Sequence, residues 1–194
     1  MAKALRIIIF VIVLGTVSSG MLEGIRRATA PLIAKNEEIK LKSAVLDVLE
    51  ADYNKDNILD VFAGQVKEIN NEAGTYYLSA DKSVAFEFSG SGLWGPISGI
   101  ASINPDLKSI KIIKILHQEE TPGLGARIAE FSYLKQFRGK EFLPKLVFTP
   151  QGKASSENEV DSITGATGSS KALEKLLNAE LEKNINIFKK TGLQ

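Results

Sequence analysis

The feature that most constrains this chain is a run without any charged residue near its N-terminus, residues 7–22. A helix needs about 20 apolar residues to cross a bilayer, and this run suffices when Arg6 extends its side chain to the interface. A cleaved signal peptide has a shorter apolar region that ends in small residues. Residues 28–30 have that composition, but they lie well beyond the run. The sequence therefore predicts an uncleaved membrane anchor, residues 1–25, ahead of one domain, residues 26–194.

The composition excludes several classes of function. The chain has 194 residues, 44% of them hydrophobic, enough for one domain with a core. With a net charge of +1 and no basic stripe, it offers no electrostatic argument for a nucleic-acid partner. It has no cysteine, which excludes iron–sulfur clusters, c-type haem and thiolate zinc sites as resident cofactors. Electron transfer by this chain would require an organic cofactor. The single histidine, His117, is assigned no role.

The pattern of apolar residues predicts an α+β fold: a single transmembrane helix, then one domain of antiparallel half-sheets flanked by helices. Helical spacing runs from Pro31 to about Ala51 and recurs from Ser169 for about five turns, through Leu173, Leu176, Leu177, Leu181 and Ile185. Residues 126–137 are also predicted to be helical. Alternating or β-rich runs predict strands at residues 65–70, 75–80, 83–88, 97–103, 108–117 and 146–149. The polar segments 52–60 and 151–159 are predicted to be surface connections.

The single tryptophan, Trp94, stands in the segment Gly92-Leu93-Trp94-Gly95. An isolated tryptophan commonly belongs to a hydrophobic core. Glycines on both sides favour instead a ring carried on a loop, where it can lie beside a planar ligand.

A second loop is rich in hydroxyl groups and precedes the C-terminal amphipathic helix: Thr164-Gly165-Ala166-Thr167-Gly168-Ser169-Ser170-Lys171. The first turn of a helix has backbone N–H groups without partners and the positive end of the helix dipole, so anions settle there. Glycines let the backbone approach a ligand closely. The segment predicts a phosphate site, while a plain N-cap is the alternative, because Ser and Thr are common at helix starts.

Three segments together resemble one family. The segment Thr164-Gly165-Ala166-Thr167 resembles its Ser/Thr-Gly-Ala-Thr signature. Upstream, and in the family's order, stand Gly92-Leu93-Trp94-Gly95 and Glu120-Thr121-Pro122-Gly123-Leu124-Gly125. The family is that of FMN-binding domains, which includes the G subunit of Rnf and the C subunit of Na⁺-translocating NADH:quinone oxidoreductase. The resemblance implies that Thr167 carries FMN covalently through a phosphoester bond.

The resemblance also implies the rest of the site. The phosphate is expected near Thr164, Gly165, Ala166, Gly168, Ser169 and Ser170, and the isoalloxazine ring against Glu120, Thr121, Pro122, Gly123, Leu124 and Trp94. Glu120 has a second interpretation, as a cap of the helix that follows. Near Thr167 only Asp161 is a candidate base. This fits the family, in which a separate Mg²⁺-dependent flavin transferase moves the FMN portion of FAD onto the threonine, so no catalytic residue and no resident metal are expected.

The implied function is that of a G-type subunit of an Rnf complex, in which FMN relays single electrons between centres held by other membrane subunits. Such a subunit completes no reaction alone. The alternatives are the C subunit of the quinone oxidoreductase and an anchored, non-redox module that binds a phosphorylated ligand. Basic residues on both sides of the apolar run leave its orientation open. The resemblance implies one span in the lipid of the inner membrane, with the flavin domain on the periplasmic side.

Overall fold

The computed structural model describes residues 2–71 and 74–191, and the chain divides into two compact units, residues 1–41 and 42–194. The first unit consists of the N-terminal part of helix α1 (Ala2–Leu49). By length and composition, this helix is able to cross a membrane. The sequence places Pro31 in the first turn of a second helix, but α1 continues through it. Proline lacks an N–H group, so this continuity costs one backbone hydrogen bond.

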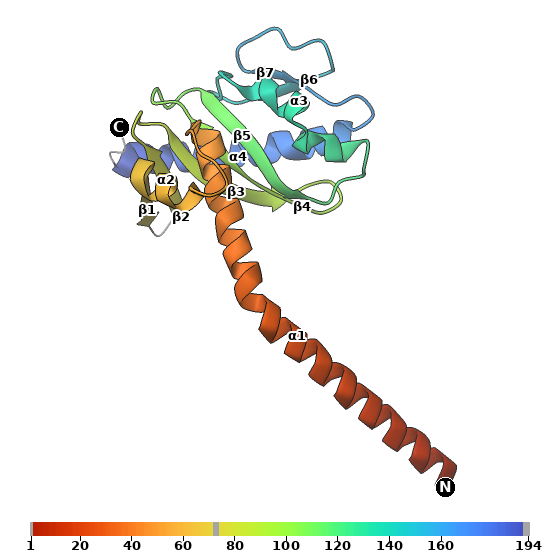
Figure 1. The fold of residues 1–194 in the computed structure, drawn as a ribbon. Helices are drawn as coiled ribbons and strands as arrows, with labels where there is room; N and C mark the ends of the chain where they lie inside the picture. The colour runs from red at the N-terminus through yellow and green to blue at the C-terminus, as the bar shows by residue number, and fades with distance from the viewer. Residues whose placement is uncertain (1, 72–73, 192–194) are drawn as a thin grey trace. The chain divides into compact units, whose positions relative to one another are not determined.

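The second unit is built on one five-stranded antiparallel sheet in the order β1-β2-β3-β4-β5, which Figure 1 shows. Its strands are β1 (Val66–Asn71), β2 (Gly74–Ser79), β3 (Val84–Ser91), β4 (Pro96–Ile103) and β5 (Ile110–Gln118). The predicted α+β class, with antiparallel strands and helices, is confirmed. The two strand groups form a single sheet, because β3 and β4 pair from Val84↔Ile103 to Ser91↔Pro96.

The remaining elements surround this sheet. They are α2 (Ile58–Gln65), the 3₁₀ helix η1 (Gly125–Ala129), α3 (Phe131–Leu134), the 3₁₀ helix η2 (Lys135–Phe137), the parallel pair β6 (Val147–Thr149) and β7 (Glu159–Asp161), and α4 (Thr167–Thr191).

Three of these elements differ from the prediction. Helix α2 occupies part of the segment predicted to be a polar connection, and it buries Ile58 and Phe62, which lie one turn apart. Residues 126–137 form three short helical turns, because Glu130 has an extended backbone with ψ of 134°. Strand β7 lies in and beyond the predicted surface segment 151–159, where the apolar side chain of Val160 is buried.

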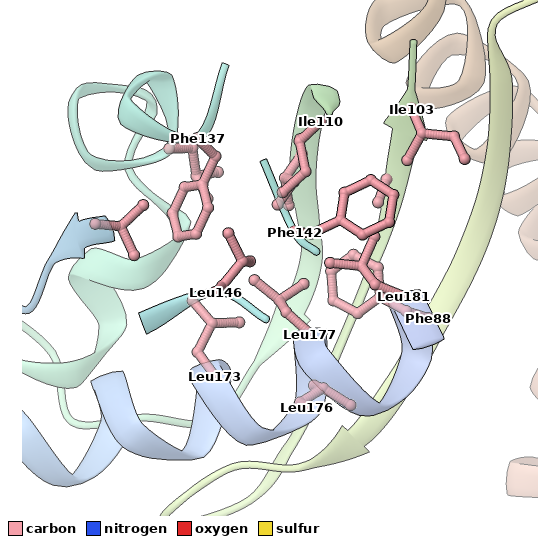
Figure 2. Close-up of a cluster of buried hydrophobic side chains, with 14 of the residues drawn as sticks. Phe88, Ile103, Ile110, Phe137, Phe142, Leu146, Leu173, Leu176, Leu177 and Leu181 are labelled. Carbon is pink, nitrogen blue, oxygen red and sulfur yellow. The ribbon is translucent and has the colours of Figure 1, made fainter. Parts of the chain in front are cut away.

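Helix α4 covers one face of the sheet. Leucines project from it toward Ile110, Phe142 and Leu146, as Figure 2 shows. In β4, Ile103 belongs to this cluster, whereas the preceding Ser102 donates a hydrogen bond of 2.5 Å to the carbonyl of Val48 in α1. Because neighbouring side chains of a strand point to opposite faces, residues 42–49 cover the other face. The sheet is thus packed between α4 and the last turns of α1.

The end of α1 is held to the sheet by a polar cluster around Lys111. The Lys111 ammonium donates to the carbonyl of Leu49 at 3.1 Å and to Asp81 at 2.7 Å. Partial burial alone would raise the pKa of Asp81, but the bond from Lys111 and the N–H and O–H groups of Ser83 outweigh it and lower this pKa to about 2.

This cluster predicts an acid-dependent loss of stability. A carboxyl group whose pKa is lower in the folded than in the unfolded state stabilises the fold above its unfolded pKa of about 4, and this stabilisation is lost as the pH falls toward 2. In thermal denaturation of the full chain in detergent, we expect Asp81→Asn to lower the Tm at pH 6 and to flatten its dependence on pH between about 4 and 2. The exposed Asp52→Asn should change neither. Parallel pH profiles for Asp81→Asn and the parent would contradict this role.

Candidate functional site

The tip of the β3–β4 hairpin carries two exposed apolar side chains. Residues 92–95 form its turn, in which the N–H of Gly92 donates to the carbonyl of Gly95 at 2.8 Å. Leu93 is 52% exposed and Trp94 is 72% exposed. The structure therefore places Trp94 on a loop, as its flanking glycines predict.

The hydroxyl-rich loop leads directly into α4, whose first residue is Thr167. The first backbone bond of this helix joins the N–H of Ser170 to the carbonyl of Ala166 at 3.0 Å. The N–H groups of Thr167, Gly168 and Ser169 consequently have no acceptor within the helix. Thr167 itself is exposed, so its hydroxyl stands at the positive end of the helix dipole and is accessible from solvent.

The loop before α4 is held at both ends. Its first threonine, Thr164, donates from its hydroxyl to the side-chain oxygen of Gln151 at 2.5 Å. At the other end, the buried hydroxyl of Ser170 accepts a bond of 3.0 Å from the N–H of Ile163. Between them, Gly165 has a φ of +80°, which favours glycine. Thr164 and Ser170 therefore shape the loop that presents Thr167.

Asp161 is already engaged by the backbone. The N–H of Ala154 donates to its carboxylate at 3.0 Å, and that of Lys153 at 3.1 Å. These bonds, that of Ala154 foremost, hold the pKa of Asp161 below its usual range. A carboxylate of low pKa is a weak base, so Asp161 would do little to activate the Thr167 hydroxyl as a nucleophile.

The segment at residues 120–125 lies against this loop. The carbonyl of Thr121 accepts from the N–H of Leu124 at 3.1 Å and of Ala126 at 3.0 Å, which closes a tight turn. Thr121, Pro122 and Gly123 are exposed, and Leu124 is 46% exposed. A Cβ added at Gly165 would lie 3.4 Å from Leu124, and one added at Gly168 would lie only 2.7 Å from Leu93. Two leucines thus cover the two glycines that flank Thr167.

Glu120 joins all three segments, which the sequence did not indicate. Its side chain is buried, with 4% exposure. One carboxylate oxygen accepts from the N–H groups of Leu93, at 2.6 Å, and Trp94, at 3.3 Å. The other accepts from the hydroxyl of Ser169 at 2.7 Å. The interpretation of Glu120 as a cap of the next helix is wrong, because η1 has Leu124 at its N-cap and no side-chain cap bond.

Gly125 leaves room for this contact. A Cβ at residue 125 would lie 2.9 Å from the Cβ of Glu120 and would overlap the Ser169 hydroxyl. We therefore expect Gly125→Ala to lower the free energy of unfolding by about 1–3 kcal/mol, the usual cost of overpacking. Gly64→Ala in α2 is the matched control, because a Cβ there meets nothing within 4 Å. Urea denaturation measures the free energy of unfolding of both variants. If Gly125→Ala is as stable as the parent, the space at residue 125 is not needed.

The geometry fits a flavin mononucleotide. The exposed start of α4 offers backbone N–H groups to a phosphate. Leu93, Trp94 and Leu124 supply exposed apolar surface nearby, as a flat ring system requires. Among the described residues, no three His, Asp or Glu side chains gather in a way that could hold a metal ion.

Comparison with known proteins agrees with this geometry. Residues 92–182, which include all three segments, match the family of FMN-binding domains. The chain is 32% identical over 108 residues to the C subunit of the Na⁺-translocating NADH-quinone reductase of Pasteurella multocida, an alignment that covers 53% of this chain and 40% of that protein. It is 28% identical over 165 residues to the G subunit of the Na⁺-translocating ferredoxin:NAD⁺ oxidoreductase complex of Acetobacterium woodii, which covers 84% and 74%.

Solved structures show the same fold. The crystal structure of the C subunit of the Na⁺-translocating NADH-quinone reductase from Parabacteroides distasonis has a TM-score of 0.68 at 22% identity and covers 79% of this chain and 94% of that one. The crystal structure of Shewanella oneidensis NqrC has a TM-score of 0.69 at 19% identity and covers 81% and 99%. At such identities the likeness establishes the fold alone. The chain matches less than half the length of the C subunit from P. multocida.

Proposed function

Because residues 92–182 belong to the family of FMN-binding domains, we propose that this chain is a membrane-anchored electron carrier whose FMN is attached to Thr167. It serves as a G-type subunit of an Rnf complex, in which other membrane subunits donate and accept the electrons. When bound, FMN supplies one-electron redox chemistry. The chain itself completes no reaction.

The observation that carries this proposal is the convergence of three distant segments at buried Glu120. The hairpin tip, the turn at residues 120–125 and the first turn of α4 meet there through the bonds from Leu93, Trp94 and Ser169. A helix start alone would account for phosphate binding, but it would not account for the two exposed apolar loops beside it. A flavin needs both features, a place for its phosphate and an apolar surface for its ring.

The residues of the site have separable roles in this proposal. The free N–H groups of Thr167, Gly168 and Ser169 stabilise the phosphate, while Leu93, Trp94 and Leu124 exclude water from the ring. Thr164 and Ser170 hold the loop so that the Thr167 hydroxyl stays accessible. Since Asp161 gives little activation, the phosphoester is formed by a separate flavin transferase that recognises this exposed loop.

The G-type assignment rests on how much of each relative is matched. The alignment with the G subunit extends over 74% of that protein, whereas the alignment with the C subunit of P. multocida covers 40%. The C subunit of a quinone reductase is the second candidate, because its aligned part is 32% identical to this chain, against 28% for the G subunit. Both candidates share the same flavin site.

The test is the visible spectrum of the full chain, purified in detergent after co-expression with a flavin transferase. We expect a flavin spectrum, and yellow fluorescence that stays with the polypeptide in a denaturing gel. Colour that is lost on denaturation would refute the covalent bond. A colourless protein that still binds inorganic phosphate would favour the non-redox module. The identity of the subunits that co-purify with the chain would distinguish an Rnf complex from a quinone reductase.

The membrane arrangement follows from the apolar run. We propose that residues 1–25 are the anchor in the cytoplasmic membrane and that residues 26–194 form the domain on its periplasmic side. The full chain should therefore require detergent, and protease added to cells with a permeabilised outer layer should digest the domain. Protection of the domain until the inner membrane is lysed would place it in the cytoplasm and contradict the orientation. A cytoplasmic marker protein that stays intact serves as the control.

A further inference from the structure

Glu120 is a buried carboxylate whose partners come from elsewhere in the chain. Its contacts to the hairpin tip reach 26 and 27 residues back in the sequence, and its contact to α4 reaches 49 residues ahead. Among the described residues, no lysine, arginine or histidine forms an ion pair with it. Burying a carboxylate without a cation is costly unless its oxygens accept several hydrogen bonds. Here the N–H groups of Leu93 and Trp94 and the hydroxyl of Ser169 donate these hydrogen bonds.

The space around this carboxylate is provided by glycines of two segments. A Cβ at Gly92 would overlap one carboxylate oxygen of Glu120, and a Cβ at Gly125 would lie 3.0 Å from the other. Two glycines of the sequence motifs thus serve to admit the Glu120 side chain between the hairpin and α4.

We propose that Glu120 is the positioning residue of the flavin site: it sets the distance between the hairpin tip, which bears Leu93 and Trp94, and the first turn of α4, which bears Thr167. The expected effect on the flavin, that its ring and its phosphate are held at a fixed separation, rests on the proposed function. The link between the hairpin and the helix does not depend on that function. Both carboxylate oxygens of Glu120 accept hydrogen bonds from protein donors, so the side chain acts here on the protein segments that form the site.

Position and charge are separable by substitution. In Glu120→Gln, the amide oxygen accepts from the N–H groups of Leu93 and Trp94, while the amide nitrogen donates to the Ser169 oxygen, which is able to accept as well as donate. The link is preserved and the carboxylate is gone. In Glu120→Ala both are lost. If Glu120→Gln behaves like the parent, Glu120 therefore acts through the geometry of its hydrogen bonds and not through its charge.

The first measurement uses the full chain without flavin, in detergent. We expect Glu120→Ala to speed hydrogen exchange of the Leu93 and Trp94 amides by about tenfold or more, as for loss of a bond to a charged acceptor, and Glu120→Gln to stay close to the parent. Trp94 is the single tryptophan, so its fluorescence reports the same loop without interference. The neighbouring Glu119→Ala is the matched control. Glu119 is exposed, pairs with His117 and packs on Gly95 of the hairpin turn, but it makes no bond to the N–H groups of Leu93 and Trp94.

The second measurement uses the flavin-loaded chain and compares its absorption spectrum and midpoint potential. We expect Glu120→Ala to shift both, and Glu120→Gln and Glu119→Ala to retain the parent spectrum. Unchanged exchange and spectrum in Glu120→Ala would overturn the proposal, as would Glu120→Gln behaving like Glu120→Ala. If Glu120→Ala does not fold, Ser169→Ala, which cuts only the link to α4, replaces it and must shift the spectrum while the Leu93 amide stays protected. Absence of flavin in every variant would refute the proposed function, while the exchange data would still decide the link.

Discussion

Replacing Thr167 by alanine is expected to abolish covalent flavin completely. The phosphoester in our proposal has a single possible oxygen at this position, the Thr167 hydroxyl, which is exposed at the first residue of α4. Alanine removes that oxygen and leaves the backbone N–H groups of the helix start in place. Fluorescence of the polypeptide in a denaturing gel, after co-expression with the transferase, measures the loss. A fluorescent band from Thr167→Ala would show that the attachment site is elsewhere.

Two further variants show whether the loss is specific. Thr167→Ser retains a hydroxyl and should still accept FMN. Thr164→Ala removes the 2.5 Å bond to Gln151 but leaves Thr167 intact, so it should reduce loading only in part. Gln151→Ala removes this bond and also the 3.3 Å bond from the N–H of Thr164, so it should reduce loading at least as much as Thr164→Ala. Lower loading in Thr164→Ala than in Gln151→Ala would indicate that the Thr164 hydroxyl acts on the flavin or the transferase rather than on the loop.

The largest expected effect on stability comes from Leu173→Ala. Leu173 is completely buried, two turns into α4 from the flavin loop, and it packs in the cluster that includes Leu146 and Phe137 (Figure 2). Truncation of a buried leucine to alanine costs about 2–5 kcal/mol, because the cavity collapses only in part. Urea denaturation of the flavin-free full chain in detergent measures this difference.

The exposed Glu182→Ala on the same helix is the control, since a surface substitution changes stability by about 0.5 kcal/mol or less. Leu173→Ala should also loosen the start of α4 and slow flavin loading. If its stability equals that of Glu182→Ala, the helix is not held to the sheet as Figure 2 shows.

Much of the fold could be predicted from periodicity. The alternation of Val84, Phe86 and Phe88 identified β3, and the leucine spacing identified α4, because each pattern comes from a face that is buried in the same way along its whole length. The short elements could not be predicted so readily. The segment that forms α2 is mostly apolar from Ile58 to Ala63, and in so short a run periodicity does not distinguish a helix from a buried strand.

The candidate site shows a similar division. Thr164 to Thr167 and the tryptophan loop were recognisable because their chemistry is local: hydroxyls, glycines and a helix start. The role of Glu120 was not, since its partners are two backbone N–H groups and one hydroxyl from other segments, and no sequence pattern encodes which N–H groups converge on a carboxylate. The break at Glu130 was hidden for a related reason, because tertiary packing overrode the local helix propensity of residues 126–137.

The order of the elements also has a consequence in time. Each strand from β2 to β5 pairs with the strand before it, so the sheet consists of contacts between neighbours in the sequence and needs no distant partner to begin forming. Helix α4, which covers one face and begins with Thr167, follows all the strands of the sheet in the described part of the chain. During synthesis the strands of the sheet therefore emerge before α4, and the loop that presents Thr167 takes shape after the sheet. In our proposal, modification of this threonine is consequently an event of the finished domain, and a flavin on the chain would mark molecules whose folding is complete.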